Sequence, residues 1–130
     1  MAPFVLIVED DEDLRPELVE FLRRRGRRVR GCESLAAARK TLDETLAKRT
    51  APQHIISDVG LPDGDGLGLF SEFAHRLPDT RWLLMSGSHD VERLTKTLRH
   101  LETPHRPLVI EKPFSLRVLQ KFVDDSPPED

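Results

Sequence analysis

The sequence predicts an α/β fold: a single doubly wound (βα)5 domain, with five parallel strands in one sheet and helices on both of its faces. Two observations predict it. Short apolar runs alternate five times with segments that carry apolar residues at helical spacing. The chain has 130 residues, which fits one domain. The carboxyl ends of the strands line the ligand crevice in such sheets, so residues that follow each strand are the first candidates for a site.

The first two strand–helix units occupy the first third of the chain. Residues 4–8 (FVLIV) are continuously apolar, which predicts a strand buried on both faces. The helix that follows is expected to be capped by Asp13 and to end at Gly26. Val29–Cys32 predicts a weaker second strand, and Ser34 is the expected cap of the second helix.

The remaining three units follow the same order. Their strands are predicted at residues 54–58, 82–85 and 108–110. A helix is expected after each strand, and the expected N-caps are Asp65, Ser88 and Ser115. We expect residues 1–123 to form the domain and the acidic, proline-containing segment 124–130 (DDSPPED) to be disordered.

Composition excludes several classes of protein. Hydrophobic residues make up 38% and charged residues 33%, and the formal net charge of -3 gives no general attraction to nucleic acid or anionic membranes. A single cysteine, Cys32, cannot form an internal disulfide and suits a reducing compartment. The apolar runs are too short to span a bilayer. We therefore expect a cytoplasmic protein with no direct contact to nucleic acid or membrane.

One segment is strongly basic. Six arginines fall within eight positions: Arg23, Arg24, Arg25, Arg27, Arg28 and Arg30. Positive charge suits the C-terminal end of a helix, so a solvated helix end is the first interpretation. A docking patch for an acidic partner is the second. Nucleic-acid binding is the third, and no interleaved aromatic residues support it.

Acidic residues follow two of the predicted strands. Glu9, Asp10 and Asp11 come after the first strand, and Asp58 ends the third. If these strands are neighbours, their carboxylates share one pocket, where like charges repel one another. A hard divalent cation relieves this repulsion, and an oxygen-only ligand set suits Mg2+.

Small and cationic residues follow the last two strands. Ser86 and Gly87 come after the fourth strand, and Lys112 after the fifth. A carboxylate beside Mg2+ is a plausible nucleophile toward phosphorus. Lys112 and the Ser86 hydroxyl could each bind a phosphoryl oxygen, and Gly87 leaves room for the group. The residues alone therefore predict that Asp58 accepts a phosphoryl group.

The motifs LIVEDD, ISDVGLPDGDGL, LLMSG and VIEKPF, in this order and spacing, resemble the receiver domain of two-component response regulators. The resemblance covers about residues 4–123 and implies a flavodoxin-like sheet of order 2-1-3-4-5. It also implies a phosphoacceptor signalling module. A histidine kinase or a histidine phosphotransfer protein would pass a phosphoryl group from phosphohistidine to Asp58, and this would switch a partner-binding surface. The module would not be an enzyme beyond self-catalysed phosphorylation and dephosphorylation at Asp58.

The resemblance also assigns roles to single residues. It implies that Mg2+, or Mn2+ in its place, is held by Glu9, Asp10, Asp58 and the carbonyl of Gly60. It implies that the phosphoryl group is bound by Ser86, Gly87 and Lys112, and that the Lys112–Pro113 bond is cis. Val109 stands where the family carries an aromatic residue that responds to Ser86. The usual aromatic flip cannot occur here, so we expect a different switch. We also expect the domain to be a monomer or a weak homodimer.

Three alternatives remain open at this stage. The receiver could stand alone or belong to a hybrid sensor histidine kinase, and LLMSG resembles the kinase-attached group more closely. An aspartyl-phosphate phosphatase of the haloacid dehalogenase type uses similar groups, although its nucleophile normally follows the first strand, where Glu9 and Asp11 do not fit its pattern. A degenerate receiver could act as a scaffold.

Overall fold

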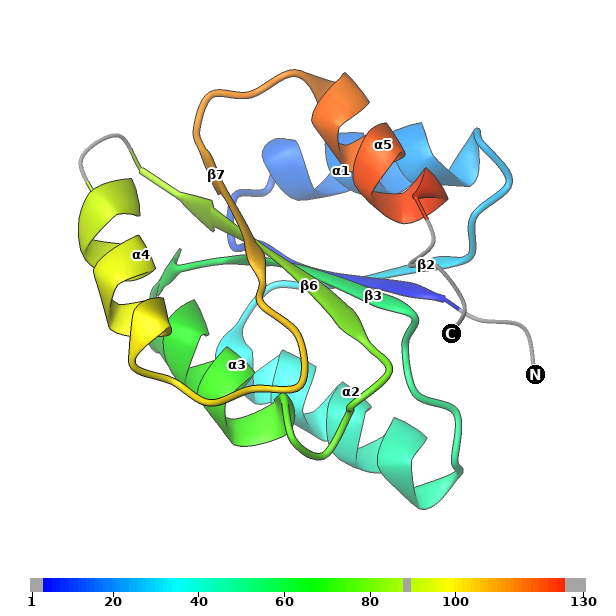
Figure 1. The fold of residues 1–130 in the computed structure, drawn as a ribbon. Helices are drawn as coiled ribbons and strands as arrows, with labels where there is room; N and C mark the ends of the chain where they lie inside the picture. The colour runs from blue at the N-terminus through cyan, green and yellow to red at the C-terminus, as the bar shows by residue number, and fades with distance from the viewer. Residues whose placement is uncertain (1–3, 88–89, 126–130) are drawn as a thin grey trace.

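The computed structural model describes residues 4–87 and 90–125, and its centre is a parallel sheet (Figure 1). The sheet has five strands in the order β2-β1-β3-β6-β7. Their bounds are β1 Val5–Val8, β2 Val29–Cys32, β3 His54–Asp58, β6 Arg81–Ser86 and β7 Leu108–Glu111. Two further two-residue strands, β4 Gly60–Leu61 and β5 Gly64–Asp65, form a separate hairpin. Apart from this hairpin, the strand order is the predicted 2-1-3-4-5, so the predicted fold is confirmed.

Helices cover both faces of the sheet (Figure 1). One face carries α1 (Leu14–Arg23) and α5 (Leu116–Asp124). The other carries α2 (Leu35–Ala47), α3 (Gly66–Phe73) and α4 (Val91–Arg99). Side chains along β1 alternate between the two cores. The continuous apolar run of β1 therefore reflects burial on both faces, as the sequence indicated.

Three of the expected helix caps are present. The side chains of Ser34, Asp65 and Ser115 accept hydrogen bonds from the backbone N–H groups of Ala37, Leu67 and Arg117, at 3.1, 2.8 and 3.2 Å. Ser88, the expected cap of α4, lies outside the described residues. These bonds satisfy N–H groups that a helix start otherwise leaves without a partner.

The cap of α1 differs from the prediction. Asp13 occupies the N-cap position, but its side chain makes no capping hydrogen bond. Asp11 supplies the cap instead, because its Oδ1 accepts from the N–H groups of Asp13 and Leu14 at 2.8 and 2.9 Å. Asp13 has a helical backbone conformation, whereas a capping side chain usually comes from an extended residue.

The end of α5 is tied to the rest of the domain. Asp124, the last residue of the helix, pairs with Arg27 at 2.7 Å, and the carbonyl of Asp125 accepts from Arg81 at 2.9 Å. The helix thus extends one residue into the segment that was expected to be disordered, and residues 126–130 lie outside the description. Within the described ranges, none of the helices combines the length and apolar character needed to cross a bilayer.

His54 is a buried ionisable group in β3. It is 2% exposed, its ring packs edge-on against Phe122 at 5.0 Å, and its Nδ1 has no hydrogen-bond partner among the described residues. Burial, together with the positive charges of Arg27 and Arg81, lowers the pKa of His54 to about 4, against a weaker opposing effect of Asp124. His54 is therefore neutral in the folded protein near neutral pH.

We expect the free energy of unfolding to fall as the pH drops from about 6.5 to about 4, because the unfolded chain then binds a proton at His54 that the folded protein does not. The full loss from this group is about 3 kcal/mol. Urea denaturation across this pH range should show a weaker pH dependence for His54→Leu than for the wild type. The exposed His75 provides a control, and His75→Gln should match the wild type. Equal pH dependence in all three proteins would contradict the assignment.

Candidate functional site

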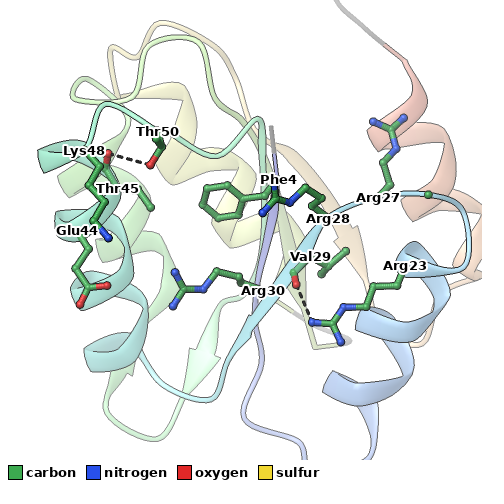
Figure 2. Close-up of a pocket in the computed structure, with 11 residues that line it drawn as sticks. Phe4, Arg23, Arg27, Arg28, Val29, Arg30, Glu44, Thr45, Lys48 and Thr50 are labelled. Atoms are coloured by element: carbon green, nitrogen blue, oxygen red, sulfur yellow. Dashed lines mark hydrogen bonds between the residues drawn. The ribbon is translucent and has the colours of Figure 1, made fainter. Parts of the chain in front are cut away.

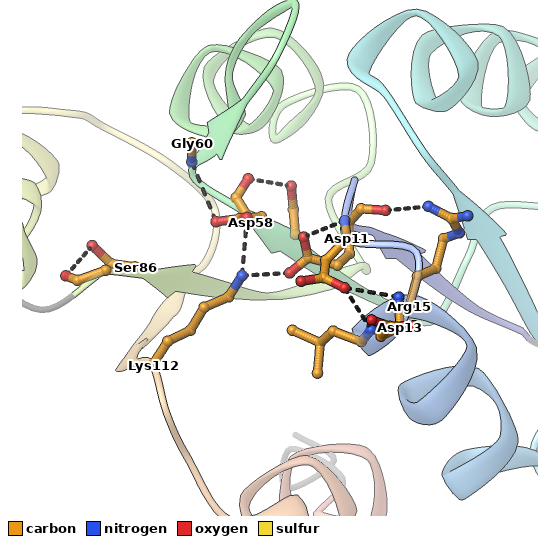
Figure 3. A network of polar contacts seen from close by, with 11 residues as sticks. Asp11, Asp13, Arg15, Asp58, Gly60, Ser86 and Lys112 are labelled. Atoms are coloured by element: carbon orange, nitrogen blue, oxygen red, sulfur yellow. Dashed lines mark hydrogen bonds and ion pairs between the residues drawn. The ribbon is translucent and has the colours of Figure 1, made fainter.

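The carboxyl ends of the central strands meet in an open pocket of about 470 Å³. Asp58 enters it from β3, Ser86 from β6 and Lys112 from the segment directly after β7 (Figure 3). The predicted site residues Gly60 and Gly87 also line it. Parallel strands bring these positions together although they lie far apart in the sequence.

Three carboxylates gather beside this pocket. Glu9, Asp10 and Asp58 each offer an oxygen, and these oxygens lie within 4.8 Å of one another. Glu9 is 1% exposed and Asp58 8% exposed, so two of these carboxylates are buried. Carboxylate oxygens in this number fit a hard cation such as Mg2+, which retains several water ligands of its own. The donor set therefore suits the ion that the sequence predicts.

Lys112 links two of these carboxylates. Its ammonium group donates to Glu9 Oε1. It also donates to Asp58 Oδ2 at 3.0 Å (Figure 3). Burial alone would lower the pKa of Lys112, but its hydrogen bonds to Glu9 and Asp58 outweigh burial and the pKa is raised. Burial raises the pKa of Glu9, against the opposing effect of the Lys112 hydrogen bond. Lys112 thus partly balances a cluster that is negative overall.

The loop after β3 contacts the Asp58 carboxylate through a backbone N–H group. The Gly60 N–H lies 3.3 Å from Asp58 Oδ1, and the Val59 N–H donates to the carbonyl of Met85 at 2.9 Å. The N–H of Gly66, at the start of α3, donates to the Val59 carbonyl at 2.8 Å. These bonds fix where the chain turns after Asp58. The role of the Gly60 carbonyl as a metal ligand stays a prediction.

Asp63 fastens the same loop to helix α2. Its Oδ1 and Oδ2 accept hydrogen bonds from the N–H groups of Leu35 and Ala36, each at 3.0 Å. These two bonds lower the pKa of the Asp63 carboxyl. The sequence did not identify this contact, because Asp63 and the start of α2 are far apart in the chain and no local pattern links them. The loop that follows Asp58 is therefore joined to a neighbouring helix as well as to the sheet.

Ser86 ends β6 with its side chain buried. Its hydroxyl lies 3.3 Å from the Gly87 carbonyl, and its own carbonyl accepts from the Lys112 N–H at 2.7 Å. Val109 pairs with Leu84 in the sheet register and packs on the side of α2, α3 and α4. The Lys112–Pro113 peptide is cis, as the resemblance implied.

Arg93 is a pocket residue that sequence reasoning missed. It belongs to α4 and lines the pocket together with Asp90, its partner in an ion pair at 3.4 Å. Among the described residues that line this pocket, Arg93 and Lys112 are the two cations. In the sequence, only the place of Arg93 near the start of the helix that follows Ser86 could have indicated that it lines the pocket. A guanidinium group that lines the same pocket as Asp58 is a candidate partner for an anion bound there.

Comparisons with known proteins identify the family of the chain. The family model described as "Response regulator receiver domain" matches residues 5–124. The chain therefore belongs to the response regulator receiver domain family. The chain is 33% identical to the response regulator protein FleR of Pseudomonas aeruginosa, over a match that covers 95% of this chain. It is 29% identical to the sensor kinase CckA of Brucella abortus, over a match that covers 93% of this chain.

Solved structures show the same fold. A response regulator receiver domain protein from Clostridium thermocellum superposes with a TM-score of 0.79 at 14% identity, over 95% of this chain and 92% of that one. NtrX from Brucella abortus gives a TM-score of 0.77 at 25% identity, over 95% of this chain and 26% of that one. The chain spans only 24% of the length of FleR and 12% of CckA. The similarity to these relatives is thus a similarity to one part of each.

Proposed function

We propose that this domain is the phosphoacceptor module of a two-component phosphorelay and that Asp58 takes the phosphoryl group from phosphohistidine on a histidine kinase or a histidine phosphotransfer protein. One observation carries the proposal: Lys112 contacts Asp58 and Glu9 beside a cluster of three carboxylate oxygens that suits Mg2+. Such a module acts in the cytoplasm, where kinases and phosphotransfer proteins reach it.

The transfer conserves atoms and charge in a single displacement. An oxygen of the Asp58 carboxylate attacks phosphorus, the bond from phosphorus to the histidine nitrogen breaks, and the imidazole keeps the electron pair and takes up a proton. Mg2+, when bound by Glu9, Asp10 and Asp58, supplies positive charge to the phosphoryl oxygens.

The other groups of the pocket bind the transferred group. Lys112 lies 3.0 Å from Asp58 Oδ2 and can move its hydrogen bond to a phosphoryl oxygen once that carboxylate oxygen carries the phosphoryl group. The hydroxyl of Ser86 can rotate away from the Gly87 carbonyl to donate to a second oxygen. The Gly60 position offers no side chain to orient an attacking water, which favours slow hydrolysis of the product.

Asp58→Asn should abolish phosphoryl uptake, because an amide is a poor nucleophile toward phosphorus. Intact-mass spectrometry after incubation with acetyl phosphate would measure this, with Mg2+ and with EDTA. The wild type should gain one phosphoryl group only with Mg2+. The control Asp79→Asn makes the same chemical change at an exposed position and should behave as the wild type does.

The same experiment separates the alternatives. Full uptake by Asp58→Asn would contradict the assigned acceptor. Sustained release of phosphate from p-nitrophenyl phosphate by the wild type would favour a phosphatase of the haloacid dehalogenase type. If the wild type gains no phosphoryl group and releases no phosphate from acetyl phosphate, the domain is a degenerate receiver that serves as a scaffold.

Arg93→Ala should slow phosphoryl uptake by about tenfold, because a charge-assisted hydrogen bond to the incoming phosphoryl group is lost. The rate of mass gain with acetyl phosphate measures the effect. Arg99 lies in the last turn of the same helix and does not line the pocket, so Arg99→Ala is a charge-matched control. Equal rates for the two variants would show that Arg93 has no part in binding the phosphoryl group.

A further inference from the structure

A second pocket, which we call the β2 pocket, lies at the outer edge of β2, away from the Asp58 site. It has a volume of about 650 Å³ and is bordered by β2 and by the C-terminal ends of α1 and α2 (Figure 2). Residues 21–32 (FLRRRGRRVRGC) contain six arginines and no acidic residue, in a chain whose net charge is -3. Five cationic side chains line the pocket: Arg23, Arg27, Arg28, Arg30 and Lys48.

Two of these five cations already have partners in the protein. Arg23 donates to the Val29 carbonyl at 3.0 Å, and Arg27 pairs with Asp124 at 2.7 Å. Arg28, Arg30 and Lys48 have no hydrogen bond or ion pair from their side chains within the part of the chain that the structure describes. Glu44 is the one acidic residue among the described residues that line the pocket, and it forms no ion pair with these three cations. The cations that line the pocket therefore outnumber its carboxylates. All three side chains are exposed, so they are accessible to an anion that enters the pocket.

The first interpretation of the arginine cluster, a solvated helix end, accounts for other members of it. Arg25 donates to the Phe21 carbonyl at 3.1 Å, and Arg24 pairs with Glu20 at 2.8 Å, both at the end of α1. These two residues do not line the β2 pocket. Arg24 and Arg25 thus belong to the helix end alone, whereas Arg23, in the last turn of α1, also lines the pocket.

The shape of the pocket favours a small ligand. Its volume lies within the range of small-molecule sites, about 300–1,000 Å³. The Phe4 ring offers an apolar surface, while Thr45 and Thr50 lie on the side of α2 (Figure 2). An extended nucleic acid would need a longer basic track with several stacking aromatic residues. Guanidinium and ammonium groups around a concave site are the usual ligands of phosphate.

We propose that the β2 pocket binds a small polyanion with at least two linked phosphate groups, of the class of nucleoside polyphosphates. Arg28, Arg30 and Lys48 bind the phosphate groups, and the Phe4 ring contacts the base. The pocket lies where Phe4 leads into β1 and Val29 begins β2, at the amino ends of the strands, whereas the Asp58 site lies at their carboxyl ends. Ligand binding here does not require phosphorylation of Asp58.

Isothermal titration calorimetry with pyrophosphate, ADP and adenosine tests the proposal. EDTA keeps the acidic pocket free of Mg2+, so phosphate cannot bind there through the metal. The wild type should bind pyrophosphate, and the double variant Arg28→Ala/Arg30→Ala should lose at least about tenfold in affinity. Arg24→Ala/Arg25→Ala removes the same charge outside the pocket and should stay within about twofold of the wild type. Phe4→Leu should weaken ADP binding more than pyrophosphate binding.

Several results would overturn the proposal. Absence of heat with pyrophosphate at millimolar concentration would do so, as would equal losses in the two double variants, which would show a general effect of charge. Binding of a poly-glutamate peptide without binding of pyrophosphate would identify an acidic protein segment as the ligand instead. Urea denaturation of each variant checks that the loss of binding does not come from unfolding.

Discussion

Lys112→Ala is expected to slow phosphoryl uptake at Asp58 by about 10²–10³-fold, the usual cost of removing one donor that stabilises charge in a transition state. In the unphosphorylated domain, the Lys112 ammonium group contacts both Glu9 and Asp58. During transfer it is the cation next to the oxygen that forms the new bond. Without Lys112, negative charge on the phosphoryl oxygens meets two carboxylates with no protein cation between them.

Two measurements separate this role from a structural one. Time-resolved intact-mass spectrometry with acetyl phosphate gives the rate of uptake, and calorimetry gives the affinity for Mg2+. Lys112→Ala should retain Mg2+ binding, because the three carboxylates remain. Lys96→Ala removes an exposed lysine from α4 and should leave both quantities unchanged. A normal uptake rate in Lys112→Ala would contradict its role, and loss of Mg2+ binding would point to a collapsed site.

Gly66→Ala is expected to destabilise the domain by about 3 kcal/mol and to displace Asp58. A Cβ atom at position 66 would lie 2.1 Å from the backbone carbonyl oxygen of Asp58. The obstacle is backbone rather than a flexible side chain, so the start of α3 and the end of β3 would have to separate. The hydrogen bond from the Gly66 N–H to the Val59 carbonyl would be lost as they do.

Gly68, two residues further along α3, supplies the matched control. A Cβ atom at position 68 meets nothing within 4 Å, and alanine favours a helix over glycine by up to about 1 kcal/mol. In urea denaturation, Gly68→Ala should therefore be at least as stable as the wild type. Gly66→Ala should be far less stable than either of these two proteins. Equal stability of the two variants would contradict the close approach of α3 to Asp58.

Much of the fold could be predicted because its signals are local. The apolar run in β1 and the capping residues Ser34, Asp65 and Ser115 each indicate a structure within a few positions of the chain. The hairpin of β4 and β5 was missed because two residues per strand leave no periodic pattern. The cap of α1 was assigned to Asp13 instead of Asp11, because several consecutive acids offer equivalent candidates and backbone conformation decides among them.

The site shows the same division between local and distant information. Parallel strands place their ends at one edge of the sheet, so Glu9, Asp58 and Lys112 could be grouped from strand positions alone. Asp63 and Arg93 could not, because their roles depend on how the loop after β3 meets α2 and how α4 faces the pocket. These contacts come from tertiary packing, which a single sequence does not display.

Chemical mapping of the phosphorylated residue is the most direct test of the central claim, that Asp58 is the phosphoacceptor. Borohydride reduces an acyl phosphate to the alcohol and releases phosphate, so a phosphorylated aspartate becomes homoserine. After treatment with acetyl phosphate and Mg2+, peptide mapping should find homoserine at position 58 and aspartate at positions 10, 11 and 63. Homoserine at another position, with Asp58 unmodified, would contradict the account.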